Sequence, residues 1–295
     1  MANKRKLTID KTFLSLDNAE ERGFIHRDYI AHCLRWTHVC KRLMKQHVFK
    51  TTKMLDVGCG RELPLARTLY SARLIPIEYV AVDVGPIEDE SLSMVAKSGK
   101  FPIRAYEKTD LCEEGFLEEE KGSYDMITCF EVLEHVEPDH MLNMLEKMHR
   151  LLKQDGEAVI STPVWNGVDT ANNHVDEIRY DIFGSCLELC GFKIKEQYGT
   201  FASQSEYKQH FTGPELALFN KLQAYYDSNF LSCVFAPLFP AQSRNCLWVV
   251  SPASDDTVKR FAPLALLSAE KGGSSCRWGT LVREGWLAKF ISDRQ

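Results

Sequence analysis

Three features that define other protein classes are missing from this sequence of 295 residues. No stretch approaches the run of about 20 apolar residues that a membrane-spanning helix needs. No apolar core follows the charged start MANKRKLTIDK, so we expect no secretory signal. The ten cysteines show no paired C-x-x-C spacing, which disfavours a zinc site or a disulfide framework and favours reduced thiols. Together these absences predict a cytoplasmic protein without a membrane anchor.

Charge is spread unevenly along the chain, although the formal net charge is only −5. Residues 1–53 carry 12 Lys and Arg against 5 Asp and Glu, and residues 257–295 carry 7 against 3. The two ends are therefore +7 and +4, which leaves −16 for the middle of the chain. Basic ends on an acidic body favour either an anionic partner such as nucleic acid, or simply a solvated helix face and a soluble tail.

Strand and helix signals alternate through the central part of the chain. The predicted strands are 53–57, 78–83, 102–106, 124–130, 157–162, 191–198 and 244–251. The predicted helices are 61–72, 88–98, 138–153 and 175–190. This alternation predicts an α/β fold with a doubly wound, seven-stranded, mainly parallel sheet and helices on both faces. In such a sheet a ligand binds beyond the carboxyl ends of the strands.

Two segments flank the predicted core of residues 53–252, and a third is inserted within it. Residues 1–52 contain one or two amphipathic helices, interpreted as a lid from which Arg35 or Tyr29 reaches the ligand site. Residues 200–242 form a helical insertion before the last strand, and residues 253–295 a tail with a short helix. A long insertion at a loop position is often functional. We expect this one beside the ligand site, with a small aromatic subcore as the alternative.

The segment MLDVGCGRELPLARTL, residues 54–69, predicts a strand, a tight turn and a helix. Gly58 and Gly60 would allow the backbone to approach a ligand closely. A dinucleotide would need a third glycine where Glu62 stands, and a carboxylate there repels a pyrophosphate at the helix N-terminus. Asp56 adds a second negative charge. The turn therefore favours a ligand with a positive or zwitterionic group and disfavours a nicotinamide dehydrogenase.

Suitable side chains also follow the next three predicted strands. Asp83 ends the strand EYVAVDVG and is placed to accept both hydroxyls of a ribose. The segment KTDLCE places Asp110 where it could meet an adenine amino group, with Leu111 against the ring. The fourth strand ends in Phe130 and Glu131 beside the same crevice. The sequence thus predicts one nucleoside-binding crevice built from four strand ends.

These motifs, in this order and spacing, resemble those of the class I S-adenosylmethionine-dependent methyltransferases. The matching segments are LDVGCG, VAVDVG, KTDL, YDMITCFEVLEHV and LLKQDGEAVISTP, with SRNCLWVVSP as a late strand. The family commonly has G-x-G-x-G, from which Arg61 and Glu62 depart. The resemblance implies a Rossmann-like methyltransferase fold and S-adenosylmethionine as cofactor. It also implies eight cofactor-binding residues: Asp56, Gly58, Gly60, Asp83, Val84, Asp110, Leu111 and Phe130.

The resemblance implies methyl transfer to oxygen or nitrogen of a polar acceptor, such as a sugar, a nucleotide or a small metabolite. After the fourth strand the chain has FEVLEH, and it lacks the Asn/Asp-Pro-Pro-aromatic and Pro-Cys motifs of two classes of DNA methyltransferase. An RNA or DNA methyltransferase that grips phosphates with its basic ends is the alternative. A non-catalytic module that binds the cofactor is a third, and the presence of Asp83 disfavours it.

The motif EVLEH supplies the catalytic candidates. Glu131, Glu134 and His135 are spaced i, i+3, i+4, so a helical turn would place them on one face, and His174 lies on a later loop at the same end of the sheet. Two carboxylates and two imidazoles suit Mg²⁺ or Mn²⁺.

This set resembles that of the small-RNA 3′-terminal 2′-O-methyltransferases, although EVLEH also occurs in ubiquinone-type O-methyltransferases. Without a metal, His135 or His174 would act as a general base, with Glu131 as the third catalytic candidate. The remaining alternative is that EVLEH only starts a helix. His140, on the following helix, is interpreted as a surface residue.

Overall fold

A computed structural model describes residues 27–46, 51–74, 77–97, 101–165, 171–201 and 208–254. Its centre is one seven-stranded sheet with the strand order β3-β2-β1-β4-β5-β7-β6. The strands are β1 Thr52–Val57, β2 Ile77–Val82, β3 Ile103–Tyr106, β4 Tyr124–Phe130, β5 Leu152–Pro163, β6 Phe192–Phe201 and β7 Asn245–Pro252. Among these strands, β7 alone runs antiparallel to its two neighbours, β5 and β6, and the other paired strands are parallel. The predicted seven-stranded, mainly parallel α/β fold is confirmed.

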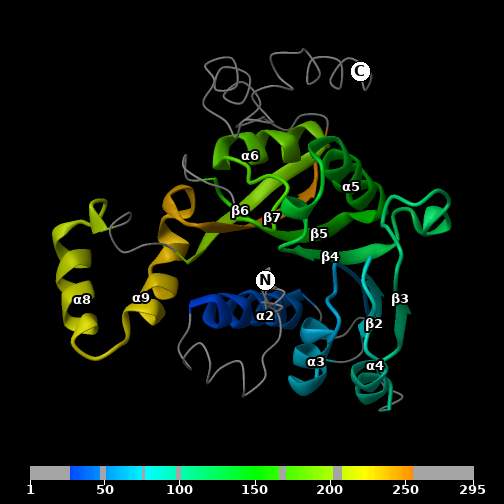
Figure 1. Cartoon of the computed structure of the whole chain (residues 1–295), viewed down its shortest axis with the longest axis horizontal. Helices are drawn as coiled ribbons and strands as arrows, with labels where there is room; N and C mark the ends of the chain where they lie inside the picture. Colours follow the sequence, from blue (N-terminus) through cyan, green and yellow to red (C-terminus); the bar gives the residue numbers. More distant parts are fainter. Residues whose placement is uncertain are drawn as a thin grey trace, which may run out of the picture.

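Helices cover both faces of this sheet (Figure 1). The helices are α2 Arg27–Gln46, α3 Pro64–Ser71, α4 Asp89–Ala96, α5 Pro138–Leu151, α6 Tyr180–Leu189, α8 Gly213–Gln223 and α9 Ser228–Val234. Helices α2, α3 and α4 lie on one face, and α5 and α6 lie on the other. No helix in the described ranges is long and apolar enough to cross a membrane.

Alternation along the strands explains the two apolar layers, because successive side chains of a strand point to opposite faces. Leu55 packs in the layer shared with α5 and α6, whereas its neighbour Met54 packs in the layer shared with α2 and α3. Trp36 and Val39 of α2 are buried in this second layer. Helix α2 is therefore part of the core, and the lid interpretation of residues 1–52 stays a prediction.

The helix predicted over 175–190 begins only at Tyr180, so the prediction was wrong for residues 175–179. The N–H groups of Val175 and Asp176 donate instead to the carbonyl oxygen of Glu134. Ile178 forms a β-bridge with Val164. These long-range bonds hold the segment as a loop at the carboxyl edge of the sheet.

The insertion of residues 200–242 contains α8 and α9, and α8 projects away from the sheet (Figure 1). Its aromatic residues Phe211, Phe219, Phe235 and Phe239 pack against one another. They form a small apolar cluster separate from the two main layers. These four aromatic residues therefore have a structural role, in agreement with the predicted aromatic subcore. The short helix predicted within 253–295 lies outside the described residues.

Candidate active site

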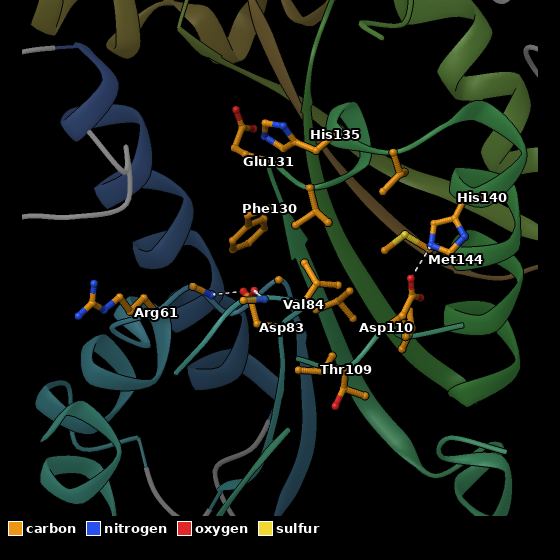
Figure 2. A pocket seen from close by; sticks show the side chains of 18 of the residues that line it. Arg61, Asp83, Val84, Thr109, Asp110, Phe130, Glu131, His135, His140 and Met144 are labelled. Atoms are coloured by element: carbon orange, nitrogen blue, oxygen red, sulfur yellow. Dashed lines mark hydrogen bonds and ion pairs between the residues drawn. The ribbon is translucent and has the colours of Figure 1, made fainter. Parts of the chain in front are cut away.

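A cavity of about 490 Å³ opens at the carboxyl edge of the sheet, beside the start of α5 (Figure 2). Its walls come from the turns that follow β1, β2, β3 and β4. Seven of the eight residues predicted to bind a ligand line it: Gly58, Gly60, Asp83, Val84, Asp110, Leu111 and Phe130. The parallel strands thus bring together side chains from four separate motifs, as expected for the ligand edge of a doubly wound sheet.

The turn after β1 requires glycine for two reasons. Gly58 and Gly60 have φ values of 68° and 73°, in the left-handed region that glycine adopts without strain. A Cβ atom at Gly58 would also lie 2.2 Å from Cγ2 of Val132. The turn therefore keeps its backbone against the cavity, and any side chain at position 58 would collide with the cavity wall.

Glu62 has a different place from the one predicted. It is not among the described residues that line the cavity, and its Oε2 lies 3.5 Å from Nη1 of Arg67. Helix α3 begins at Pro64, three residues later than predicted, because residues 60–63 form the turn. The Glu62 carboxylate therefore contacts Arg67 and is not part of the cavity wall that the described residues form.

Asp83 is fixed between two turns by backbone hydrogen bonds (Figure 2). Its Oδ2 accepts from the Gly60 N–H at 2.9 Å, and its Oδ1 accepts from the Gly85 N–H at 2.7 Å. A carboxylate offers about four acceptor positions, so two remain for a ligand. The geometry suits two neighbouring hydroxyl groups.

Asp110 stands across the cavity from Asp83, beside α5 (Figure 2). Its Oδ1 accepts from the Cys112 N–H at 2.7 Å, and its Oδ2 lies 3.0 Å from Nε2 of His140. His140 was predicted to be a surface residue, but it lines the cavity together with Met144 one helical turn later. The i, i+4 spacing of these two residues on the helix after β4 was the available signal. Other lining residues missed from the sequence are Val57, Arg61, Val82, Gly85, Pro86, Thr109, Val132 and Val136.

Asp56 is the eighth predicted ligand residue, and it is not among the described residues that line the cavity. It is buried, and its two oxygens accept from the hydroxyls of Tyr79 and Thr128. Burial raises the pKa of Asp56 to about 6, the hydrogen bonds from Tyr79 and Thr128 oppose this rise, and the charge of Asp83 adds to it. The structure therefore gives Asp56 a place in the core instead of a ligand contact.

Glu131 lies at the end of β4 with a left-handed backbone, φ 57°. Its Oε1 accepts from Nη1 of Arg35 at 3.0 Å and from the Ser161 hydroxyl at 2.8 Å. Its Oε2 accepts from the side-chain amide of Asn245. Arg35 is only 2% exposed, so this ion pair joins α2 firmly to the cavity wall. Arg35 contacts a residue of the cavity wall but is not among the described residues that line the cavity, so its predicted reach to the ligand stays a prediction. The side chain of Tyr29 lies outside the described residues.

The predicted alignment of Glu131 with Glu134 and His135 on one helical face is wrong. The short helix η2 covers only Leu133–His135, and Glu131 precedes it in a left-handed bend. Glu131 therefore belongs to the network of Arg35, Ser161 and Asn245, although its charge still acts on Glu134.

A second polar cluster lies next to the cavity. One ligand-type atom from each of Glu134, His135 and His174 lies within 4.8 Å of the others. Among the described residues, Glu131 is not part of this group. Glu134 is 1% exposed, and its Oε2 has no hydrogen-bond partner in the described part of the chain. Burial raises the pKa of Glu134 well above its ordinary value, and the charge of Glu131 raises it further.

Both imidazoles of this cluster are oriented through Nδ1. Nδ1 of His174 lies 2.7 Å from Oε1 of Glu177, and Nδ1 of His135 lies 2.9 Å from the carbonyl oxygen of Asn173. The rings meet edge to face with centroids 5.0 Å apart. His135 also lines the cavity, so the cluster adjoins the cavity at this residue.

Comparison with known protein families gives one domain match. Residues 26–211 match the family model Methyltransf_23, described as a methyltransferase domain. The chain is 35% identical over 112 residues to the ubiquinone biosynthesis O-methyltransferase of Xanthomonas oryzae pv. oryzae, covering 37% of this chain and 42% of the relative. It is 31% identical over 110 residues to the protein of that name from Pseudomonas aeruginosa, covering 37% and 44%. The match thus spans less than half of each curated relative's length.

Solved structures with a similar course of the chain include two methyltransferases. One is the 1,6-didemethyltoxoflavin-N1-methyltransferase of Burkholderia thailandensis with bound S-adenosylhomocysteine, at 15% identity and a TM-score of 0.48, covering 81% of this chain and 82% of that one. The other is the phosphoethanolamine N-methyltransferase 2 of Haemonchus contortus in complex with S-adenosylmethionine, at 15% identity and a TM-score of 0.47, covering 82% and 61%.

Proposed function

The chain belongs to the methyltransferase-domain family, and we propose that it transfers the methyl group of S-adenosylmethionine to oxygen or nitrogen of a polar acceptor. The observation that carries this proposal is the cavity at the carboxyl edge of the sheet. Seven residues from four successive motifs line that one cavity, and Asp83 and Asp110 face it from opposite sides (Figure 2).

Each part of the cofactor has a suitable counterpart in the cavity. The Asp83 carboxylate keeps acceptor positions for the two ribose hydroxyls. Asp110 suits the amino group of adenine, and Leu111 gives the ring an apolar surface. Gly58 and Gly60 leave room for the methionyl part beside the backbone. The methyl group would then face the end of β4.

Methyl transfer from a sulfonium is an in-line displacement, in which much of the rate comes from holding the two reactants in line. The acceptor would approach past Phe130 and His135, which line the cavity at the end of β4. The names of the curated relatives favour an oxygen acceptor. A sugar, a nucleotide or a small metabolite with a hydroxyl group fits this proposal.

Calorimetry tests the cofactor. S-adenosylmethionine and S-adenosylhomocysteine should both bind, and Asp83→Asn should weaken both by roughly 10- to 100-fold, because hydrogen bonds to a charged group contribute about 1.5–3 kcal/mol. Asp155→Asn, at an exposed carboxylate on β5, is the matched control and should bind normally. Tighter binding of NAD than of either ligand would overturn the assignment.

We propose as a second point that Glu134, His135 and His174 hold a divalent cation such as Mg²⁺ or Mn²⁺. The buried Oε2 of Glu134 supports this, because it has no hydrogen-bond partner among the described residues and a buried polar atom without a partner is unfavourable. The Nδ1 contacts of the two histidines make Nε2 the nitrogen that would bind a cation. Glu131, the fourth predicted ligand, does not fit this set.

A bound cation would lower the pKa of an acceptor hydroxyl that it contacts. The competing role for His135 or His174 is that of a general base, which needs no cation. In either role the site prepares an oxygen nucleophile next to the proposed methyl donor.

A chelator separates these two roles. If a cation is used, chelation should stop methyl transfer but not cofactor binding, Mn²⁺ should restore it, and His174→Ala should weaken Mn²⁺ binding measured by electron paramagnetic resonance. His210→Ala, at an exposed histidine outside the site, is the control. A direct base predicts no effect of the chelator and a severe loss in one histidine variant. Normal turnover in the alanine variants of all three residues would exclude both roles.

A further inference from the structure

Glu177 is a fully buried carboxylate on which four N–H groups converge. Its Oε1 lies 2.7 Å from Nδ1 of His174, 3.1 Å from the Ala171 N–H and 2.8 Å from Nη2 of Arg244. Its Oε2 accepts from Nη1 of Arg244, which also donates to the carbonyl oxygen of Val164. Its side chain is 0% exposed, and the partners that the described residues give it are protein groups that are already in place.

These partners determine the charge of Glu177. Both carboxylate oxygens accept from the guanidinium of Arg244, which is always charged, and this pairing together with the Ala171 N–H favours the ionised carboxylate. An ionised carboxylate only accepts hydrogen bonds. The proton between the two side chains therefore belongs to Nδ1 of His174, and in the neutral imidazole Nε2 keeps its lone pair.

The loop that carries His174 is tied at several points. Its N–H groups at positions 175 and 176 donate to the carbonyl oxygen of Glu134, at 2.8 and 3.2 Å. Ile178 bridges to Val164 on the far side, and the Trp165 N–H donates to the Ile178 carbonyl oxygen at 3.1 Å. The Glu177–Arg244 ion pair then joins the loop to the start of β7.

A purely structural Glu177 would already be satisfied by Arg244 and the Ala171 N–H. The contact with His174 comes in addition to these, and it fixes the ring orientation and the nitrogen that carries the proton. Outer contacts of this kind typically change the affinity or activity of a histidine site by about 10- to 100-fold.

We propose that Glu177 is a positioning residue for the cluster of Glu134, His135 and His174. It holds the proton of His174 on Nδ1 and presents Nε2 for ligation or proton acceptance, while Arg244 holds the carboxylate in place. This inference rests on the proposed function only in the role that it gives to Nε2 of His174, which is to bind a cation or accept a proton. The tautomer itself is a property of the chain alone.

Nitrogen-15 NMR of histidine side chains tests the inference on the full chain in chelator-treated buffer. The signals of His174 are assigned by their loss in His174→Ala. In the wild type, Nδ1 of His174 should be protonated and Nε2 unprotonated. In Glu177→Gln, whose single amide oxygen cannot serve all four donors, the opposite tautomer should become populated.

Asp181→Asn removes another carboxylate from an ion pair a few residues away, with Arg179, and should leave the tautomer unchanged. A wild-type His174 with its proton on Nε2 would overturn the inference even if Glu177→Gln fails to fold. An unchanged tautomer in a folded Glu177→Gln would overturn it too. Because the NMR measurement needs no cofactor, cation or acceptor, it stands or falls separately from the proposed methyl transfer.

Discussion

Asp56 offers the sharpest test of the physical reasoning about this fold. Its carboxyl is 3% exposed at the centre of the sheet, and within the described part of the chain it accepts hydrogen bonds from the hydroxyls of Tyr79 and Thr128. No cation balances its charge in these contacts. We expect Asp56→Asn, which removes the charge and keeps the shape, to stabilise the protein at neutral pH and to have much less effect in acid.

The magnitude follows from the pKa of Asp56 in the fold, about 6, against an ordinary value of 3.8. A difference of this size corresponds to about 3 kcal/mol. Between these two pH values the folded state binds the proton more tightly than the unfolded state. The wild type therefore has this stability in full below about pH 4 and loses it as the pH rises through about 6. The uncharged amide of the Asp56→Asn variant has no such loss.

The measurement is urea unfolding of both proteins in parallel at several pH values from 4 to 8. The advantage of Asp56→Asn should grow by about 2.5 kcal/mol across that range and level off above about pH 7. Glu118 and Glu120 have pKa values lowered to about 2, so they change the stability only below about pH 4.5. This change is the same in both proteins and cancels in the difference between them. An Asp155→Asn control should show no such trend. A difference that stays constant with pH would refute the reasoning.

Two further predictions concern binding. Gly58→Ala should reduce cofactor affinity by at least about 10-fold in calorimetry, because its Cβ would lie 2.2 Å from the cavity wall. Gly115→Ala, with φ +76° and open space around it, is the matched control and should lose only some stability, so equal affinities of the two variants would contradict the steric argument. If residues 1–53 grip a nucleic acid, the logarithm of its affinity should fall linearly with the logarithm of salt concentration, with a slope of about −0.7 to −0.9 per phosphate contact. No RNA or DNA binding at low salt would exclude that alternative.

Local sequence patterns were sufficient for the sheet and for most of the cavity. An apolar run marks each buried strand, and the parallel arrangement brings the strand ends together without further information. Gly58, Asp83 and Asp110 could therefore be placed in one cavity although they lie far apart in the sequence.

The errors arose where a partner distant in the sequence decides the outcome. Asp56 is turned into the core by Tyr79, which stands on the neighbouring strand β2. Glu131 leaves the helical face because donors from α2, β5 and β7 surround it. The anchoring of Glu177 depends on Arg244, which lies 67 residues later. Spacing along the chain carries no information about such pairs.

The left-handed backbone at Glu131 has a consequence for how this protein can change over evolutionary time. A non-glycine residue in that conformation is strained by about 1–3 kcal/mol, so glycine would relieve the backbone. Glycine would also leave Arg35 buried without its anion, which costs about 3–5 kcal/mol. Glycine at position 131 is thus tolerated only after Arg35 has been replaced. A variant that has lost Arg35 but still has Glu131 is viable, because Ser161 and Asn245 still donate hydrogen bonds to the glutamate. Among related chains, we expect an acidic residue at this bend to occur together with the arginine on α2, and glycine to occur where that arginine is missing.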